Sequence, residues 1–269
     1  GGVPAASLGG SGLDAPFTFK GGGYPGTAGT CTTSLAAGGS CTVIVVYAPS
    51  AVGNHSDAID VNYHNGVSSV SESRSVQGTA VSPANINISN TPTYNFNTVA
   101  IGAVGEHAFT LTNTGSFQAT SLTQSALSAP YAYKGGVYPG SGGTCNATLN
   151  GGASCTVVVT FTPTVTGVQN ATMSFAYDDG AQAQNKSVGM TGTGATAANL
   201  TITNSPSYNY GTRATGSTLD QSFTITNTGG VAASALTPSG LTPPFAFKGG
   251  SYPGTGGDCG ANLAPAGAC

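Results

Sequence analysis

The sequence Pro-Tyr-Ala-Tyr-Lys-Gly-Gly-Val-Tyr-Pro-Gly at residues 130–140 occurs almost unchanged at residues 16–26 and again at residues 244–254. Each copy begins 114 positions after the one before it, and the six cysteines keep the same offset. A unit of this length is longer than a solenoid repeat of about 20–50 residues and has the size of a whole β-sandwich domain. The sequence therefore predicts tandem domains built from one duplicated unit.

Short polar linkers mark the boundaries between copies. The triplets Gly-Thr-Ala at residues 78–80 and Gly-Thr-Gly at residues 192–194 each follow a strand-like run and precede such a linker. We therefore expect a partial repeat at residues 1–81, a complete repeat at residues 82–195 and a second partial repeat at residues 196–269. The simplest expectation is that the chain belongs to a longer array.

Alternation of apolar and polar residues indicates strands throughout the complete repeat. Phe109 and Leu111, for example, alternate with threonines. Asp179-Gly180, matched by Asn65-Gly66 in the first copy, is typical of a two-residue type I′ hairpin turn. Seven or eight short strands in about 110 residues predict an all-β fold, with each copy an immunoglobulin-like (Ig-like) β-sandwich.

Composition excludes several other classes of protein. The chain is 39% hydrophobic with only 6% charged residues, whereas disordered chains combine low hydrophobicity with high charge. Six lysines and arginines and a net charge of −3 exclude a nucleic-acid surface, which needs clustered positive charge. No apolar run reaches the length of a membrane span, so we expect no membrane insertion within this segment. The composition is that of an all-β extracellular protein.

The strand motifs resemble a known family. Residues 155–167 (Cys-Thr-Val-Val-Val-Thr-Phe-Thr-Pro-Thr-Val-Thr-Gly), residues 173–180 and the closing residues 192–194 resemble bacterial Ig-like repeats of the choice-of-anchor D type. Those repeats are related to Hydin-like and major-sperm-protein-like sandwiches. Asn-Thr-Gly at residues 113–115 and 227–229 fits the family's turn after its second strand. The resemblance implies a secreted or surface-anchored bacterial repeat protein, and it carries over no catalytic residues.

The cysteines form one pair per copy, ten positions apart, around a loop rich in small residues. Their even number and regular spacing predict disulfides within each repeat. The predicted pairs are Cys31–Cys41, Cys145–Cys155 and Cys259–Cys269. Zinc binding is a weaker alternative because no histidine or second cysteine pair recurs to supply four ligands. Free buried thiols are a further alternative.

Lysine is notable because charge is so scarce in this chain. Lys20, Lys134 and Lys248 occupy the same position in the three copies, and Glu106 and Asp220 occupy one shared acidic position. A partly exposed ion pair is the expected arrangement, and it would stabilise the fold by at most about 1 kcal/mol. An intramolecular isopeptide bond, which needs a lysine and an Asn or Asp beside an acid in an apolar core, is the alternative.

No catalytic constellation recurs between copies, and we expect no enzyme activity, cofactor or metal. His55, His64 and His107 align with Gln169, Asp178 and Gln221. The recurring aromatic residues next to Lys-Gly-Gly are more simply a core strand and turn than a sugar-stacking platform.

The function that these features predict is a structural segment of a long extracellular surface protein, a stiff stalk or filament whose partners are copies of itself. An adhesin module that recognises a glycan or protein through its loop tips is the alternative. Both partial repeats should expose apolar sheet edges. Either the chain is part of a longer polypeptide, or one molecule completes the next by strand donation. We favour the former because complete complementation would leave residues 229–269 duplicating residues 1–41.

Overall fold

The computed structural model describes residues 2–269, which contain sixteen strands and no helix. The predicted all-β fold class is therefore confirmed. The chain divides into two compact units, Gly1–Pro83 and Ala84–Cys269. The further division of the second unit at residue 195 stays a prediction from the 114-residue offset. Within the described part of the chain, no helix has the length and hydropathy needed to cross a membrane.

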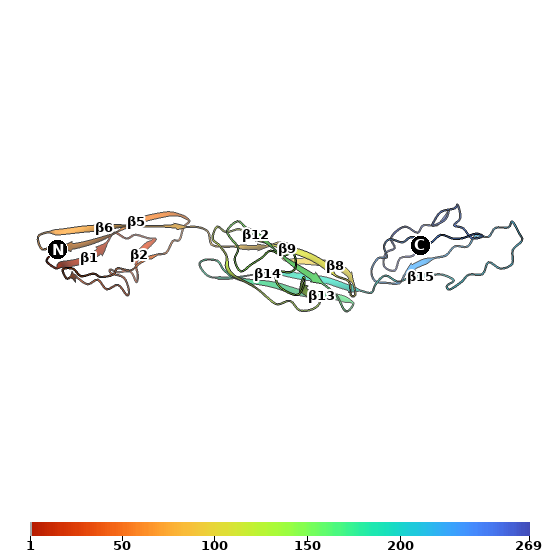
Figure 1. Cartoon of the computed structure of the whole chain (residues 1–269), viewed down its shortest axis with the longest axis horizontal. Helices are drawn as coiled ribbons and strands as arrows, with labels where there is room; N and C mark the ends of the chain where they lie inside the picture. Colours follow the sequence, from red (N-terminus) through yellow and green to blue (C-terminus); the bar gives the residue numbers. More distant parts are fainter. Residues whose placement is uncertain (1) are drawn as a thin grey trace. The chain divides into compact units, whose positions relative to one another are not determined.

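Two four-stranded sheets form the complete repeat, and Figure 1 shows them as facing layers, with β12 and β9 in one and β13 and β14 in the other. One sheet has the order β10-β13-β14-β8 and the second has the order β11-β12-β9-β7. All neighbours are antiparallel except β8, which pairs in parallel with β14. The strands are β7 (Ile86–Ile88), β8 (Thr93–Ala100), β9 (Gly105–Asn113), β10 (Thr120–Gln124), β11 (Tyr131–Tyr133), β12 (Ser154–Phe161), β13 (Gly167–Asp178) and β14 (Ala183–Ala195).

The core lies between these two sheets. Alternate residues point inward along each strand, so Phe109 and Leu111 of β9 are buried while their threonine neighbours are partly exposed. Phe161 of β12 and Phe175 of β13 reach the core from the two opposite sheets and have no exposed surface. This two-layer packing is the Ig-like sandwich that the alternation predicts.

The first unit keeps only part of this arrangement. It has a sheet of order β3-β1-β5-β6 and a separate antiparallel pair, β2 and β4. By the 114-residue offset, β5 and β6 correspond to β13 and β14, and β2 and β4 correspond to β11 and β12. The strands are β1 (Ala5–Ser11), β2 (Phe17–Phe19), β3 (Ser34–Leu35), β4 (Val45–Tyr47), β5 (Gly53–His64) and β6 (Ser69–Ala80).

Residues 196–269 contain one antiparallel strand pair, β15 (Leu200–Ile202) with β16 (Ile225–Asn227). These strands correspond to β7 and β9 of the complete repeat. Residues 207–214, which correspond to β8, form no strand.

The predicted two-residue hairpin turn at Asp179-Gly180 is wrong. The last pair of the β13–β14 ladder is Asp178 with Ala183, so the loop has four residues. Gly180 has a positive φ of 94°, but Asp179 does not share that conformation, whereas a type I′ turn requires it at both central residues. Asp179 instead accepts two backbone hydrogen bonds through its side chain, from Ala181 and Gln182. Asn65 makes the corresponding bonds in the first unit.

Gly192 of β14 is needed for close packing between the sheets. A Cβ at this position would lie 2.6 Å from Cε1 of Phe161, whose side chain is fully buried and cannot move aside. We expect Gly192→Ala to destabilise the complete repeat by about 1–3 kcal/mol through overpacking, measured by urea unfolding of the full chain. Gly9→Ala in β1 is the control because open space surrounds that position. Equal effects of the two substitutions would contradict this explanation.

Candidate functional site

The cysteine loops have the pairing that the spacing predicts. Disulfides join Cys31 to Cys41, Cys145 to Cys155 and Cys259 to Cys269, with Cα–Cα distances of 4.8, 4.8 and 4.9 Å. In the complete repeat both sulfurs belong to the buried core, and Cys155 lies in β12. Each disulfide therefore fixes a surface loop to the sandwich.

Asn113, at the end of β9, is a buried polar side chain that sequence reasoning did not identify. It has no exposed surface, and its Oδ1 accepts hydrogen bonds from the backbone N–H groups of Asn85 and Gly115. Its Nδ2 donates to the carbonyl oxygens of Phe117 and Leu149 at 2.8 and 3.0 Å. One amide thus bonds four backbone groups, and the recurrence of Asn-Thr-Gly at residues 227–229 is the signal that could have revealed it.

Asn227 makes the same connections in the last partial repeat. Its Oδ1 accepts from the backbone N–H groups of Asn199 and Gly229, and its Nδ2 donates to the carbonyl oxygen of Leu263. Because these bonds recur although the surrounding sandwich is incomplete, the asparagine fixes the local turn independently of the missing sheet.

The recurring lysines form exposed ion pairs where an acid is present. Lys134 Nζ lies 2.8 Å from Glu106 Oε1, and Lys248 Nζ lies 2.7 Å from Asp220 Oδ2. All four side chains are at least 42% exposed, which is far from the apolar core that isopeptide chemistry requires. Lys20 has no ion pair within residues 2–269. At this position the structure therefore has solvent-exposed ion pairs in the two copies that carry an acid.

Removing this ion pair should have a small effect on stability. We expect Glu106→Gln to change the free energy of unfolding by less than about 1 kcal/mol, because water and salt screen exposed charges. Thermal unfolding of the full chain at low and high salt measures the effect. An intact mass lower than that of the disulfide-bonded chain by one water or one ammonia, together with a large loss of stability in Glu106→Gln, would instead indicate an isopeptide bond from Lys134 to an Asp or Asn side chain.

The recurring aromatic residues of the complete repeat belong to the core. Tyr131 stacks on Phe161 with ring centroids 4.9 Å apart, and its hydroxyl donates to the carbonyl oxygen of Gln169. Burial raises the pKa of Tyr131 to about 12. Tyr133 meets Tyr138 edge to face at 5.6 Å, and burial raises the pKa of both. These rings are therefore packing residues in this repeat and present no open face for a sugar.

Asp179 is the buried acid of the β13–β14 loop, with 4% of its surface exposed. The backbone N–H groups of Gln182 and Ala181 and the side chain of Gln184 hold its pKa below the usual value. Its ionised form therefore stabilises the folded repeat above a pH of about 4, and this contribution is lost as the pH falls through the lowered pKa.

We expect Asp179→Asn to reduce the acid sensitivity of the complete repeat. Asparagine keeps the acceptor oxygen but does not titrate, as Asn65 shows in the first unit. The measurement is urea unfolding of the full chain between about pH 2 and pH 6, with Asp258→Asn, an exposed carboxylate, as the control. An unchanged pH dependence in Asp179→Asn would contradict the assignment.

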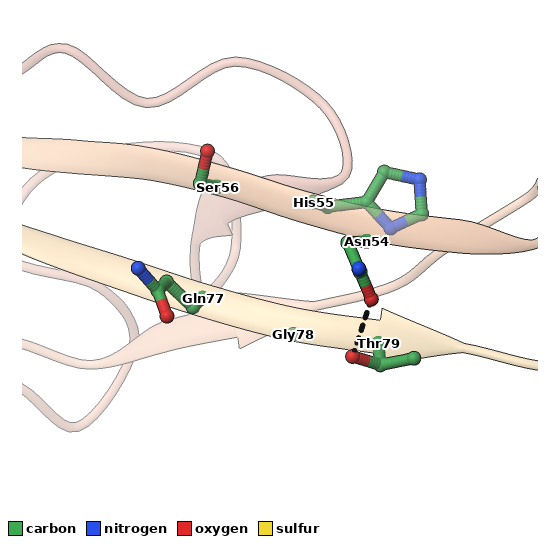
Figure 2. A pocket seen from close by; sticks show the side chains of 6 residues that line it. All are labelled: Asn54, His55, Ser56, Gln77, Gly78 and Thr79. Atoms are coloured by element: carbon green, nitrogen blue, oxygen red, sulfur yellow. Dashed lines mark hydrogen bonds between the residues drawn. The ribbon is translucent and has the colours of Figure 1, made fainter.

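An open hollow of about 520 Å³ lies on the β5–β6 hairpin of the first unit. Figure 2 shows its lining, which comes from both strands, and the hydrogen bond that Thr79 Oγ1 donates to Asn54 Oδ1 at 2.8 Å. His55 Nδ1 and the Tyr47 hydroxyl form a hydrogen bond of 2.9 Å. The six lining residues are Asn54, His55, Ser56, Gln77, Gly78 and Thr79. None of them is acidic or basic apart from the histidine, so the lining offers backbone and amide hydrogen bonds.

A second hollow, of about 240 Å³, lies in the last partial repeat beside the segment that corresponds to β8. Its lining includes Ile202 of β15 together with Tyr208, Tyr210 and Phe223.

Side chains that are core residues in the complete repeat are exposed in the last one. Phe223 is 40% exposed and Phe245 is 53% exposed, whereas their counterparts Phe109 and Tyr131 are almost fully buried. The last partial repeat therefore exposes aromatic side chains, whereas in the first unit Phe17 and Phe19 are buried. Within residues 2–269, no three His, Cys, Asp or Glu side chains cluster as metal ligands would.

One protein-family model matches most of the complete repeat. Residues 87–193 match the HYDIN/CFA65/VesB-like, Ig-like domain. Comparison with curated proteins gave no match.

Several solved structures are similar to parts of this chain at low sequence identity. The ASH/PapD-like domain 7 of human CEP192 is 20% identical over 43% of this chain and 88% of its own, with a TM-score of 0.33. The Vibrio cholerae VesB protease is 14% identical over 41% of this chain and 32% of its own, with a TM-score of 0.32. A Porphyromonas gingivalis W83 protein is 11% identical over 70% of this chain and 84% of its own, with a TM-score of 0.30.

The matched range covers β7 to β14 almost completely, which are the eight strands of the sandwich. The Hydin-like part of the resemblance seen in the sequence is therefore confirmed. Residues 87–193 of this chain form an Ig-like sandwich that is similar to the HYDIN/CFA65/VesB-like, Ig-like domain.

Proposed function

We propose that this chain is a structural segment of a long extracellular surface protein, in which tandem Ig-like repeats form a stiff stalk or filament. The observation that supports the proposal is the kind of residue that recurs at the 114-residue offset. The aromatic core residues, the cysteine pairs and the buried asparagine are kept, whereas the histidines are replaced. Copies that share packing residues and vary the rest are typical of a scaffold, and the proposed role is non-catalytic.

The disulfides support an extracellular location. Three disulfides in one chain indicate an oxidising environment, since cytosolic thiols are kept reduced. Protein isolated freshly under native conditions should therefore contain no thiol that iodoacetamide alkylates before reduction. Alkylation of all six cysteines would contradict both the location and the pairing.

Stiffness is the property that the stalk proposal requires. Linkers as short as residues 81–83 leave little slack between neighbouring repeats, and the low net charge reduces repulsion when many copies pack side by side. Small-angle scattering of the full chain should give an elongated particle whose cross-section is one domain thick. A compact globular particle would contradict the proposal.

An adhesin is the second candidate, because one end of the repeat varies between copies. The β5–β6 loop begins with Asn65-Gly66 after His64, whereas the β13–β14 loop begins with Asp179-Gly180 after Asp178. The Tyr-Pro-Gly and cysteine loops are kept in all three copies, which favours a scaffold over a recognition surface. Saturable binding of a glycan or protein that depends on residues 179–182 would support the adhesin instead.

A further inference from the structure

The loop between β5 and β6 presents an asparagine followed by a glycine. Strand β5 ends at His64 and β6 begins at Ser69, so Asn65 and Gly66 lie in the exposed loop between them. In such a pair the backbone nitrogen of the glycine can attack the carbonyl carbon of the asparagine side chain, because glycine has no side chain to hinder the approach. The rate then depends on how the surrounding groups activate the nitrogen and the carbonyl.

The attacking nitrogen has a base beside it. The N–H group of Gly66 donates a hydrogen bond to Nδ1 of His64 at 3.2 Å. Nδ1 accepts this bond, so it is the unprotonated nitrogen of a neutral imidazole. A base within hydrogen-bond reach of an N–H group can take its proton while the nitrogen reacts. His64 is therefore placed to act as the general base for the Gly66 nitrogen.

The carbonyl group under attack is polarised by the same loop. Oδ1 of Asn65 accepts hydrogen bonds from the backbone N–H groups of Val67 and Ser68 at 2.8 and 2.9 Å. Negative charge develops on this oxygen when the carbonyl carbon becomes tetrahedral. Paired backbone donors at such distances stabilise that charge, as they do in an oxyanion hole. One short loop thus activates both the nucleophile and the carbonyl.

The corresponding loop of the complete repeat shows that the reaction product fits. Asp179 occupies the position of Asn65, and its side chain accepts the two equivalent backbone hydrogen bonds at 2.8 and 2.7 Å. Asp178 replaces His64 and accepts from the N–H group of Gly180 at 2.8 Å. An aspartate at position 65 can therefore keep the hydrogen bonds of the loop.

We propose that the turn His64-Asn65-Gly66 is a self-catalysed modification site at which Asn65 loses ammonia and becomes an aspartate. The imidazole takes the proton of the Gly66 N–H group while the nitrogen forms a bond to Cγ of Asn65. The Cγ–Nδ2 bond then breaks, and Nδ2 leaves as ammonia with the proton from the imidazolium. Water from the solvent opens the resulting cyclic imide at one of its two carbonyls, to give aspartate or its isomer. Nothing is oxidised or reduced.

The modification changes the charge of a chain that has little. The net charge is −3, and each reaction adds one negative charge to an exposed loop. Repulsion between closely packed copies therefore increases over time. The inference goes beyond the proposed scaffold function and does not depend on it, because all the groups involved belong to a single loop.

The chain contains a matched internal control. Asn150-Gly151 is the second Asn-Gly pair of the sequence, and Asn150 is exposed as Asn65 is. Its Oδ1 accepts from the side-chain amide of Gln118, and the residue before it is Leu149, which cannot act as a base. A difference in rate between the two asparagines therefore measures the effect of the activating groups.

Mass spectrometry of the full chain measures both rates in one sample. The folded protein is incubated at neutral pH in heavy-oxygen water and digested in ordinary water, so that only oxygen gained during the incubation is labelled. We expect Asn65 to react at least about tenfold faster than Asn150, because a positioned general base contributes a factor of this size or more. His64→Gln keeps a hydrogen-bond acceptor but cannot take up the proton. This variant should slow residue 65 by a similar factor and leave residue 150 unchanged.

Equal rates at the two asparagines of the folded chain, or an unchanged rate at residue 65 in His64→Gln, would overturn the proposal. Unfolding in urea provides a second test. Both pairs then lose their loop contacts, so they should react at similar rates with and without His64→Gln. A preference for residue 65 that persists in urea would also overturn the proposal, since local sequence and not the folded loop would then set the rate. None of these results changes the scattering test of the scaffold.

Discussion

Replacing Asn113 with alanine should lower the free energy of unfolding of the complete repeat by at least about 3 kcal/mol, because each buried polar group left without a partner costs about 1–3 kcal/mol. The amide has no exposed surface and makes hydrogen bonds to the backbone groups of Asn85, Gly115, Phe117 and Leu149. Its loss removes the hydrogen-bond partner of the Asn85 and Gly115 N–H groups and of the Phe117 carbonyl oxygen, whereas the Leu149 carbonyl oxygen still accepts from the Ala119 N–H group. The substitution therefore removes four hydrogen bonds at once.

Hydrogen exchange of peptides from residues 84–195, followed in the full chain, measures this loss for the complete repeat alone. Asn87→Ala in β7 is the matched control, since that side chain is exposed on a neighbouring strand. Asn113→Asp should also destabilise the repeat, because the carboxylate loses both donors and buries a charge. Equal, small effects of Asn113→Ala and Asn87→Ala would show that the buried amide is dispensable.

Removing the disulfide of the complete repeat should cause the second-largest loss in its free energy of unfolding. The double variant Cys145→Ala/Cys155→Ala opens a loop with a sequence separation of ten. Chain-entropy arguments give a loss of about 2.5–3 kcal/mol for a loop of this length. Both cysteines are also core residues, so the smaller alanine side chains add a packing loss.

Cys259→Ala/Cys269→Ala is the control for this variant, because it removes the equivalent disulfide from the last partial repeat. Thermal unfolding and hydrogen exchange of residues 84–195 should change in the first variant and stay constant in the second. If reduction of the unmodified chain left the stability of the complete repeat unaltered, the disulfides would have no stabilising role.

The repeat length, the strand alternation and the cysteine spacing were sufficient to predict the sandwich and its disulfides. They could do so because the alternation of apolar and polar residues decides which side chains of a strand face the core, and Phe109 and Leu111 are buried as it predicts. The turn at Asp179-Gly180 could not be predicted, since the side-chain hydrogen bonds of Asp179 extend it to four residues. The role of Asn113 depends on Leu149, which is distant in sequence and lies beside it only in the folded domain.

The strand lengths show a further limit of local sequence. Strand β12 has eight residues, whereas its counterpart β4 has three. Strand β9 has nine residues, whereas its counterpart β16 has three. β9 and β12 pair with each other along their whole length, and each partial repeat contains only one of the two. Pairing partners, and not intrinsic propensity alone, therefore decide how far each strand extends.

Hydrogen exchange compared across equivalent positions tests most directly that the 114-residue repeat at residues 82–195 forms a closed sandwich, whereas the partial repeats on either side of it in these 269 residues do not. In dilute full-length protein, β9 and β12 should exchange slowly. Cys41, Val43 and residues 219–223, which are their counterparts outside β16 and β4, should exchange much faster despite similar sequences. The N–H groups of Thr42 and Ile44 keep hydrogen bonds to Thr30 Oγ1 and to the carbonyl oxygen of Pro25, so they should stay protected. Equal protection in all three copies would contradict the account, because it would mean that the flanking repeats are closed sandwiches in themselves.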